Sequence, residues 1–387
     1  MKIRIGPSVE GDDFFGRERE LRNLADIMSD RSASVLIPGP RRIGKSSLIM
    51  EFIRQKKAEY NFIYFDLEGR QSVMELCQDL LVEVQKSYPE YASKWPAWSK
   101  SWNTVAKMIP ELKVSGLIEF KTGKITAEAK EVIDKMEIIF DTLVDQNFIF
   151  VFDEFSDFLW KLKGKSIHEV QFFLEWLRRL RQHKKLRLIV SGSINIISTV
   201  EELNVADLIN DLVDLEIFPL KEAEIKTFLL ALLEDVKISL SDDALDFAMT
   251  RLSDGIPFFI QLFASSLRFH REGGETSYDL TEIKEIYAKI TARQHKEYID
   301  LHSRLKDYLT TDQHQAALKA LAHLASDPMN FEDLWPYVES HLTEKADFHR
   351  LLKRLADENY IVQGKQEYRF VSPMLADWWR HSYEWEK

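Results

Sequence analysis

Residues 34–47 read Ser-Val-Leu-Ile-Pro-Gly-Pro-Arg-Arg-Ile-Gly-Lys-Ser-Ser, and this stretch decides the fold. A short aliphatic run ends in a loop bracketed by Gly39 and Gly44, and a helical pattern of apolar residues follows Ser47. G-x-x-x-x-G-K-S in a strand–loop–helix setting is the pattern of a phosphate-binding P-loop. The glycines allow torsions and close approaches that a Cβ would block, so loop amides and the helix N-terminus can surround phosphate oxygens.

The P-loop pattern predicts roles for individual residues. Lys45 is expected to reach the β- and γ-phosphates, and the Ser46 hydroxyl is expected to hold Mg²⁺. An ordinary turn before a helix is the alternative, and the flanking strand and helix patterns disfavour it. The loop residues predicted to bind nucleotide are Gly39, Pro40, Arg41, Arg42, Ile43, Gly44, Lys45, Ser46 and Ser47.

A second acidic motif lies in the run Phe-Ile-Phe-Val-Phe-Asp-Glu at residues 148–154. Consecutive apolar residues that end in carboxylates predict a central parallel strand, buried on both faces, whose C-terminal end reaches the ligand edge. Asp153 is expected to fix Mg²⁺ through its water shell, and Glu154 to orient and deprotonate the water that attacks the γ-phosphate. Alone, the run also fits a buried strand with a solvated acidic end; together with the P-loop it predicts an NTPase.

Length, composition and charge limit the classes of protein that this sequence can form. With 387 residues the chain is long enough for about two or three domains, and 45% hydrophobic with 30% charged residues is typical of a globular protein. The net charge of -11 argues against broad, nonspecific adhesion to DNA or anionic lipid. Cys77 is the only cysteine, which fits a reducing cytoplasm. No apolar stretch approaches the roughly 18 residues of a membrane span, so we expect a cytoplasmic protein without a membrane partner.

Further patterns place the rest of the core. A short amphipathic helix begins near residues 14–21, and Phe15 is expected to help enclose the adenine base, although an ordinary N-terminal helix is the alternative. Residues 186–193 predict another buried strand, and residues 215–220 predict the last core strand. Residues 89–125 form an insert rich in aromatic residues and lysine. We favour a partner surface or small local core there over binding of single-stranded nucleic acid.

An ordered set of short motifs carries a family resemblance. It comprises Phe15-Gly16-Arg17-Glu18, the P-loop, Asp153-Glu154-Phe155 and Ser191-Gly192-Ser193. This set resembles the prokaryotic "archaeal ATPase" family, a branch of the STAND and initiator-like AAA+ ATPases. The resemblance covers roughly residues 10–270, with a weaker one in the C-terminal tail.

The resemblance implies further site residues. The strand end at 191–193 would be the sensor-1 position, where a hydroxyl reads the γ-phosphate or its water; Ser193 is the first choice and Ser191 the second. Pro257, within Gly255-Ile256-Pro257, would lie against the nucleotide at the start of a lid helix. A glycine and a proline at a helix start are also ordinary capping chemistry.

The sequence departs from the family pattern in its arginines. Between Arg187 and Arg251 there is none, although ring-forming AAA+ enzymes carry their trans-acting arginine finger in that interval. The lid helix after Pro257 also lacks the early arginine of sensor 2. An arginine finger is worth about 10³–10⁵ in turnover where it operates. We therefore expect slow intrinsic hydrolysis or activation by a partner, which suits a switch.

The C-terminal region predicts a winged helix. Helical patterns at 313–324, 331–338 and 344–355 precede two short alternating runs around Gly364-Lys365. The region holds more Asp and Glu than Lys and Arg, so docking of a protein, or autoinhibition, is at least as well supported as DNA binding. Contact with DNA would fall to His349, Arg350, Lys353, Arg354 and Lys365.

The predicted fold is α/β. It consists of a three-layer P-loop NTPase core of the AAA+/STAND-like type at residues 1–220, a helical lid at 221–292, a helical connector at 293–310 and a winged helix at 311–387. The predicted function is slow, Mg²⁺-dependent hydrolysis of ATP by a switch that controls a protein or DNA partner. The expected interaction is with a protein partner or with a second copy of the chain. The resemblance adds a setting in defence or mobile-element biology. The predicted catalytic residues are Glu154, Lys45 and Ser193.

Two other functions remain open. One is a DNA-binding initiator or transposition helper of the AAA+ group. The other is a nucleotide-gated scaffold that binds ATP and never cleaves it. The sequence identifies neither the partner nor the source of an arginine finger.

Overall fold

The chain forms two compact units, each assembled from segments that are far apart in the sequence. The computed structural model describes residues 1–92, 127–192, 195–271, 273–274, 276–292, 298, 303, 305–306 and 309–383. One unit, here the sheet unit, contains Arg17–Gly39 and Leu48–Ile217. The other, here the lid unit, contains Met1–Gly16, Pro40–Ser47 and Phe218–Lys387. Most of the predicted insert and of the predicted connector lies outside the described residues.

A parallel five-stranded sheet forms the centre of the sheet unit, with the strand order β2-β3-β4-β1-β5. Every residue of β3 and β4 is buried, as expected for parallel strands covered on both faces. The parallel register directs the C-terminal ends of β1, β3 and β4 to one edge of the sheet. The strands are β1 (Val35–Ile37), β2 (Asn61–Asp66), β3 (Phe148–Asp153), β4 (Arg187–Ser191) and β5 (Val213–Asp214).

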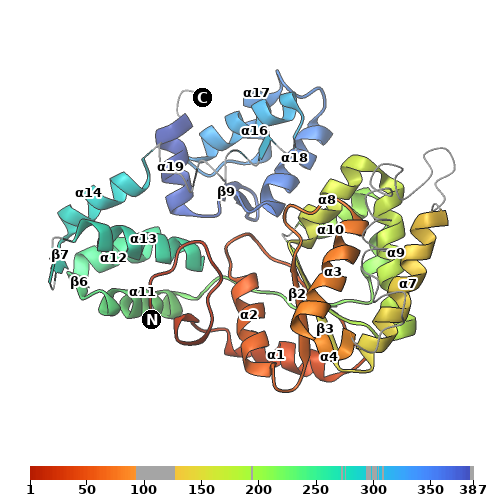
Figure 1. The fold of residues 1–387 in the computed structure, drawn as a ribbon. Helices are drawn as coiled ribbons and strands as arrows, with labels where there is room; N and C mark the ends of the chain where they lie inside the picture. The colour runs from red at the N-terminus through yellow and green to blue at the C-terminus, as the bar shows by residue number, and fades with distance from the viewer. Residues whose placement is uncertain are drawn as a thin grey trace. The chain divides into compact units, whose positions relative to one another are not determined.

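Helices cover both faces of this sheet. The connection from β1 to β2 and the connections from β2 to β3 and from β3 to β4 run in opposite directions along the sheet, so right-handed crossovers place their helices on opposite faces. Figure 1 shows α1 and α2 on one side of the strands, and α7 and α9 on the other. The predicted three-layer α/β core is thus confirmed. The helices are α1 (Glu18–Ser29), α2 (Lys45–Lys56), α3 (Val73–Ser87), α4 (Pro89–Ala92), α7 (Ala127–Val144), α8 (Phe155–Lys165), α9 (Ile167–Lys184) and α10 (Asn195–Glu202).

The hydrophobic core is largely aromatic beside β3. The ring of Phe150 on β3 packs against Phe140 of α7 at a centroid distance of 5.3 Å, and Phe140 packs against Trp176 of α9 at 5.7 Å. All three side chains are buried. Burying a side chain of this size contributes about 1.5–3 kcal/mol to the stability of the fold. This packing fixes the position of β3 and therefore of the acidic residues at its C-terminal end.

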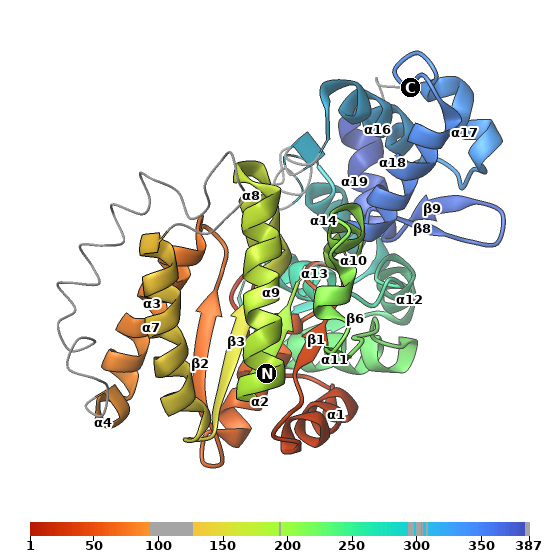
Figure 2. The same ribbon diagram turned by 90° about the vertical axis from the view of Figure 1, so that its right-hand side faces the viewer.

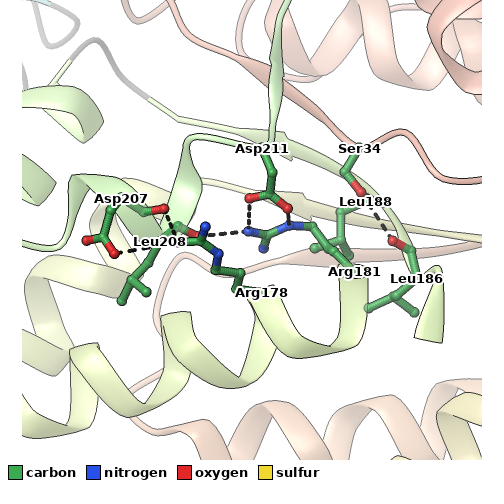
Figure 3. Close-up of polar contacts among 8 residues, drawn as sticks. All are labelled: Ser34, Arg178, Arg181, Leu186, Leu188, Asp207, Leu208 and Asp211. Carbon is green, nitrogen blue, oxygen red and sulfur yellow. Dashed lines mark hydrogen bonds and ion pairs between the residues drawn. The ribbon is translucent and has the colours of Figure 1, made fainter. Parts of the chain in front are cut away.

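A polar cluster ties α9 to the segment that leads into β5 (Figure 3). The guanidinium of Arg181 bonds both carboxylate oxygens of Asp211, at 2.7 and 3.0 Å, and donates to the Leu208 carbonyl at 2.8 Å. Its side chain is buried, and this bidentate pairing supplies the donors and charge that a buried arginine requires. Nearby, Ser34 Oγ donates to the Leu186 carbonyl at 3.2 Å and fixes the start of β1 beside β4.

The last core strand lies earlier than predicted. We expected residues 215–220, whereas β5 is Val213–Asp214, paired with Val35 and Leu36 of β1. Within the part of the chain that the structure describes, β5 pairs only with β1, which has three residues, so the ladder is short. Pro219 also lacks the N–H that a continuing strand would use.

Between Phe218 and Ile290 the described residues of the lid unit form four helices and a small sheet. The region expected to be a helical lid, residues 221–292, contains α11, α12, α13 and α14. The parallel pair β6–β7 was not predicted, because three-residue strands leave too short an alternation to detect. The elements are α11 (Glu222–Asp235), β6 (Ile238–Leu240), α12 (Asp242–Arg251), α13 (Pro257–His270), β7 (Thr276–Tyr278) and α14 (Leu280–Ile290).

The C-terminal part of this unit contains three helices, a hairpin and a closing helix. β8 and β9 pair antiparallel, and Figure 2 shows this hairpin beside α18 and α19. The element order is the predicted one, while assignment to the winged-helix class stays a prediction. The elements are α16 (Thr311–Leu324), α17 (Phe331–Val338), α18 (Lys345–Asp357), β8 (Ile361–Gln363), β9 (Tyr368–Phe370) and α19 (Pro373–Tyr383).

Capping chemistry explains where two of these helices start. Asp279 accepts from the Glu282 amide at 2.9 Å, and the Glu282 carboxylate accepts from the Asp279 amide at 2.9 Å, a capping box before α14. Thr310 and Gln313 form the equivalent pair before α16. Among the helices of the described residues, none has the length and apolar character needed to cross a bilayer.

Candidate functional site

The P-loop joins the C-terminal end of β1 to the start of α2. Gly39 and Gly44 have φ of 154° and 104°, and a Cβ on Gly44 would meet nothing within 4 Å. The positive φ of Gly44 is a conformation that side-chain-bearing residues rarely adopt. Lys45 is buried, and its Nζ donates to the carbonyl of Pro40 at 3.0 Å. The lysine thus forms a hydrogen bond within the P-loop. Ile43 is also buried and anchors the loop by its apolar side chain.

Asp153 and Ser191 meet at the C-terminal ends of β3 and β4, which are neighbours in the sheet. Asp153 is 3% exposed, and Ser191 is fully buried. The Ser191 hydroxyl donates to Oδ1 of Asp153, which also accepts from the amide of Glu154 at 3.0 Å. The hydroxyl of Tyr64 on β2 donates to Oδ2 at 2.8 Å. A buried carboxylate requires such donors, and here they hold it in one orientation.

Three side-chain-bearing residues of the predicted motifs have a left-handed backbone. Arg17, Arg42 and Glu154 have φ of 70°, 68° and 53°; Arg17 and Glu154 directly precede α1 and α8, and Arg42 lies in the P-loop before α2. Such a conformation costs about 1–2 kcal/mol per residue, and helix starts do not require it. Other described residues with positive φ follow helix ends, where the left-handed conformation terminates a helix; they are Asn147, Lys185, Asn204, Lys237 and Asn359.

Gly192 explains the small residues at the end of β4. A Cβ on Gly192 would lie 3.1 Å from Oγ and 3.3 Å from N of Ser156, in the first turn of α8. The glycine therefore allows the end of β4 to approach the helix that follows Glu154. Ser193, the first choice for the sensor-1 hydroxyl, lies outside the described residues, and Ser191, the second choice, contacts Asp153.

A tight turn precedes α13 of the lid. Gly255 has a φ of 66°, and a Cβ there would lie 2.2 Å from the carbonyl oxygen of Leu220. The amide of Leu220 donates to the Gly255 carbonyl at 2.9 Å, so the two backbones touch. Pro257 occupies the first turn of α13, where its missing N–H costs nothing. The guanidinium carbon of Arg42 lies 3.8 Å from the ring centroid of Phe258, which follows Pro257.

Contacts from the N-terminal segment reach the same unit. Phe15 stacks on Phe228 of α11, with centroids 4.8 Å apart and rings 17° from parallel. The amide of Val9 donates to Ser47 Oγ at 3.2 Å. The P-loop residues 40–47, residues 1–16 and the lid thus belong to one compact unit. Sequence reasoning named Phe15, Arg42 and Pro257 but missed the aromatic partners Phe228 and Phe258, which no local pattern signals.

The strand order, the P-loop pattern and the acidic end of β3 are those of a P-loop NTPase. The model of a family described as ATPase domains predominantly from Archaea matches residues 14–263, and the chain belongs to this family. The predicted resemblance to archaeal ATPases is thereby confirmed, as are nucleotide binding and ATPase activity in general terms.

Solved structures share the fold. A Walker-type ATPase of Pyrococcus abyssi superposes with a TM-score of 0.64 at 20% identity, over 98% of this chain and 100% of that chain. The ORC2 protein of Aeropyrum pernix, in ADPNP–ADP complexes, superposes with a TM-score of 0.55 at 15% identity, over 99% of this chain and 95% of that chain. No curated protein matches the chain.

Proposed function

We propose that the chain is an ATP-dependent switch, in which the P-loop and lid bind ATP and the C-terminal helices report the bound nucleotide to a protein or DNA partner. The observation that carries this proposal is the contact between Arg42 and Phe258, 3.8 Å from guanidinium carbon to ring centroid. It links a residue of the P-loop to the first turn of a lid helix. A phosphate that attracts the Arg42 guanidinium competes with the aromatic ring for it, so nucleotide binding changes a lid contact.

Ring contacts continue from Phe258 toward the C-terminal helix. Phe258 packs on Phe259 at 5.5 Å, Phe259 stacks on Tyr298 at 6.1 Å, and Tyr298 stacks on Trp378 of α19 at 5.2 Å. Tyr298 and Trp378 are buried. Closely packed side chains respond to displacement by moving together, so this series supports a route from loop to α19.

A polar cluster adds a second connection between the lid and α19. Asp377 is 7% exposed and accepts from the hydroxyl of Tyr287 at 2.7 Å. The guanidinium of Arg251 lies 3.2 Å from the same carboxylate oxygen. Helices α12 and α14 are therefore joined to α19 through one buried acid.

The chemistry of ATP cleavage falls to the residues predicted from the motifs. Glu154 activates the attacking water, Lys45 contacts the β- and γ-phosphates, and Ser193 reads the γ-phosphate. We place Phe15 and Pro257 beside the nucleotide base. Glu154 holds a strained backbone at the end of β3, which supports a functional role.

The donor chemistry of Ser46 and Asp153 fits Mg²⁺, which prefers hydroxyl and carboxylate oxygens. A carboxylate offers about four acceptor positions, and Asp153 receives three hydrogen bonds within the described residues, so a position on Oδ2 remains. Mg²⁺ would neutralise charge on the transferred phosphate.

Slow turnover is supported by the arginines that flank the arginine-free interval. Arg187 is the first residue of β4, at the strand end opposite Ser191, and its guanidinium bonds Asn147 and lies 4.9 Å from the ring centroid of Tyr60. Arg251 is engaged with Asp377. We propose that a partner supplies the missing cation. We also propose a cytoplasmic location and the defence or mobile-element setting that the family resemblance implies.

The test is hydrogen–deuterium exchange of α19 without nucleotide, with ADP and with a non-hydrolysable ATP analogue. We expect the analogue to alter exchange of α19 in the wild type. In Phe258→Leu, which keeps Arg42, we expect the analogue to bind with little change in affinity and exchange of α19 to respond weakly. Phe269→Leu alters an exposed phenylalanine of the same helix and is the matched control. Equal responses in all three proteins would contradict the switch.

DNA binding by α18 is the second candidate. His349, Arg350 and Lys353 are exposed, which favours it, while Arg350 already pairs with Asp347. DNA affinity that falls steeply with salt, and that drops in Arg350→Ala/Lys353→Ala, would support this candidate. A single-turnover assay separates both from a scaffold, which would bind ATP without releasing phosphate.

A further inference from the structure

The hydroxyl of Tyr64 contacts the acid at the end of the neighbouring strand. β2 and β3 pair in parallel, with Tyr64 opposite Val151 and Asp66 opposite Asp153. The Tyr64 side chain therefore extends two residues along the sheet toward the C-terminal edge. There its hydroxyl donates to Oδ2 of Asp153 at 2.8 Å.

The hydroxyl is what distinguishes Tyr64 from its neighbours on β2. Phe62 and Phe65 show that phenylalanine is compatible with this strand. Oδ1 of Asp153 accepts from Ser191 and from the amide of Glu154, whereas Oδ2 accepts from Tyr64. The phenol is protonated near neutral pH, so its hydroxyl donates to the carboxylate.

We propose that Tyr64 is a positioning residue for Asp153. Its hydroxyl holds the carboxylate in one rotamer and keeps the acceptor position left on Oδ2 available to a water molecule of Mg²⁺ bound with ATP. The inference rests on the proposed role of Asp153. A residue that orients a metal-binding group affects metal affinity by about 10–100-fold. Because Asp153 acts through water, the lower end, about tenfold, is expected for loss of the Tyr64 hydroxyl.

The experiment measures Mn²⁺ affinity by electron paramagnetic resonance, with the full chain saturated by a non-hydrolysable ATP analogue. Tyr64→Phe removes the hydroxyl and keeps the ring. We expect this variant to bind Mn²⁺ about tenfold more weakly than the wild type. Its affinity for the analogue in excess EDTA is expected to be unchanged, because the P-loop contacts do not involve Tyr64.

Tyr88→Phe is the matched control. The hydroxyl of Tyr88 also bonds β2, donating to the Phe62 carbonyl at 2.9 Å and accepting from the Phe62 amide at 3.0 Å, but it does not contact Asp153. Loss of this hydroxyl should leave Mn²⁺ affinity unchanged. A Tyr64→Phe variant that binds Mn²⁺ like the wild type, or no more weakly than Tyr88→Phe, overturns the proposal.

A double-mutant cycle with Asp153→Asn separates this inference from the function on which it rests. If Tyr64 acts through Asp153, adding Tyr64→Phe to Asp153→Asn should not weaken Mn²⁺ binding further. Additive losses would overturn the positioning role while Asp153 keeps its own. Wild-type Mn²⁺ affinity in Asp153→Asn would instead remove the role of Asp153, and the proposal for Tyr64 with it.

Discussion

The guanidinium of Arg251 in α12 lies 3.2 Å from the carboxylate of Asp377 in α19. Arg251 also lies over the rings of Phe247 and Tyr287, at 5.3 and 5.6 Å from their centroids. Within the lid unit this one side chain thus joins the helices of the lid to the closing helix of the chain. The charge and the aliphatic stem of Arg251 both stabilise this link, because Asp377 is buried and the aromatic rings pack along the arginine.

Arg251→Ala should destabilise the lid unit by about 1–3 kcal/mol, because Asp377 loses a charged partner while it remains buried. Lys345→Ala is the control, since the Lys345–Glu332 pair is exposed and such pairs contribute about 0–1 kcal/mol. Urea denaturation followed by circular dichroism measures both variants. Equal midpoints for the two would contradict a structural role for Arg251.

Glu154→Gln should lower ATP turnover by about 10²–10⁴-fold, because glutamine cannot accept the proton of the attacking water. ATP affinity should be retained, since the substitution leaves the P-loop intact. Phosphate release and titration calorimetry measure the two quantities. Asp157→Asn, which changes an acid of α8 that pairs with Lys161 at 2.5 Å, is the matched control. Unchanged turnover in Glu154→Gln would exclude it as the base.

Gly255→Ala should destabilise the lid unit, because the new Cβ would lie 2.2 Å from the Leu220 carbonyl oxygen. Overpacking costs about 1–3 kcal/mol, and the left-handed backbone adds about 1–2 kcal/mol. Gly274→Ala separates the two costs, since Gly274 has a φ of 65° and open space around it. Thermal denaturation should show a larger loss for Gly255→Ala; equal losses would mean that the close approach to Leu220 does not matter.

Asp254 should make stability depend on pH. Burial raises the pKa of this carboxyl to about 6, whereas in the unfolded chain it is about 3.9. When the pH lies between these two pKa values, Asp254 is protonated in the folded chain and deprotonated in the unfolded chain. This stabilisation is complete below the unfolded pKa and is lost as the pH rises through the folded pKa.

Asp254→Asn should remove that dependence, because the asparagine side chain does not titrate. Its amide oxygen can still accept from the Ile256 amide, which lies 2.8 Å away, so the local hydrogen bond is kept. From about pH 5 to about pH 8 the wild type should lose about 1.4 kcal/mol of unfolding free energy relative to the variant. Urea titrations at a series of pH values measure the difference. Parallel curves for the two proteins would show that the carboxyl is not perturbed.

The parts of the site that follow one another along the chain could be predicted from sequence. The P-loop follows its strand, and the acidic pair follows an apolar run, because each motif is local. Tyr64 could not be assigned to Asp153, since an aromatic residue in an apolar strand is ordinary and the contact depends on strand order. The same holds for Phe258, whose partner Arg42 is far away in the sequence. β5 was misplaced because an edge strand of two residues carries almost no alternation.

The chain passes between its two units at Gly16–Arg17, Gly39–Pro40, Ser47–Leu48 and Ile217–Phe218. No single cut can therefore release either unit whole, and a fragment starting at Phe218 would lack both Phe15 and Arg42. A chimera in which the residues after Ile217 come from a relative would combine the P-loop of this chain with the aromatic lid residues of the relative. Successful exchange requires that residues 1–16 and 40–47 be replaced together with the lid.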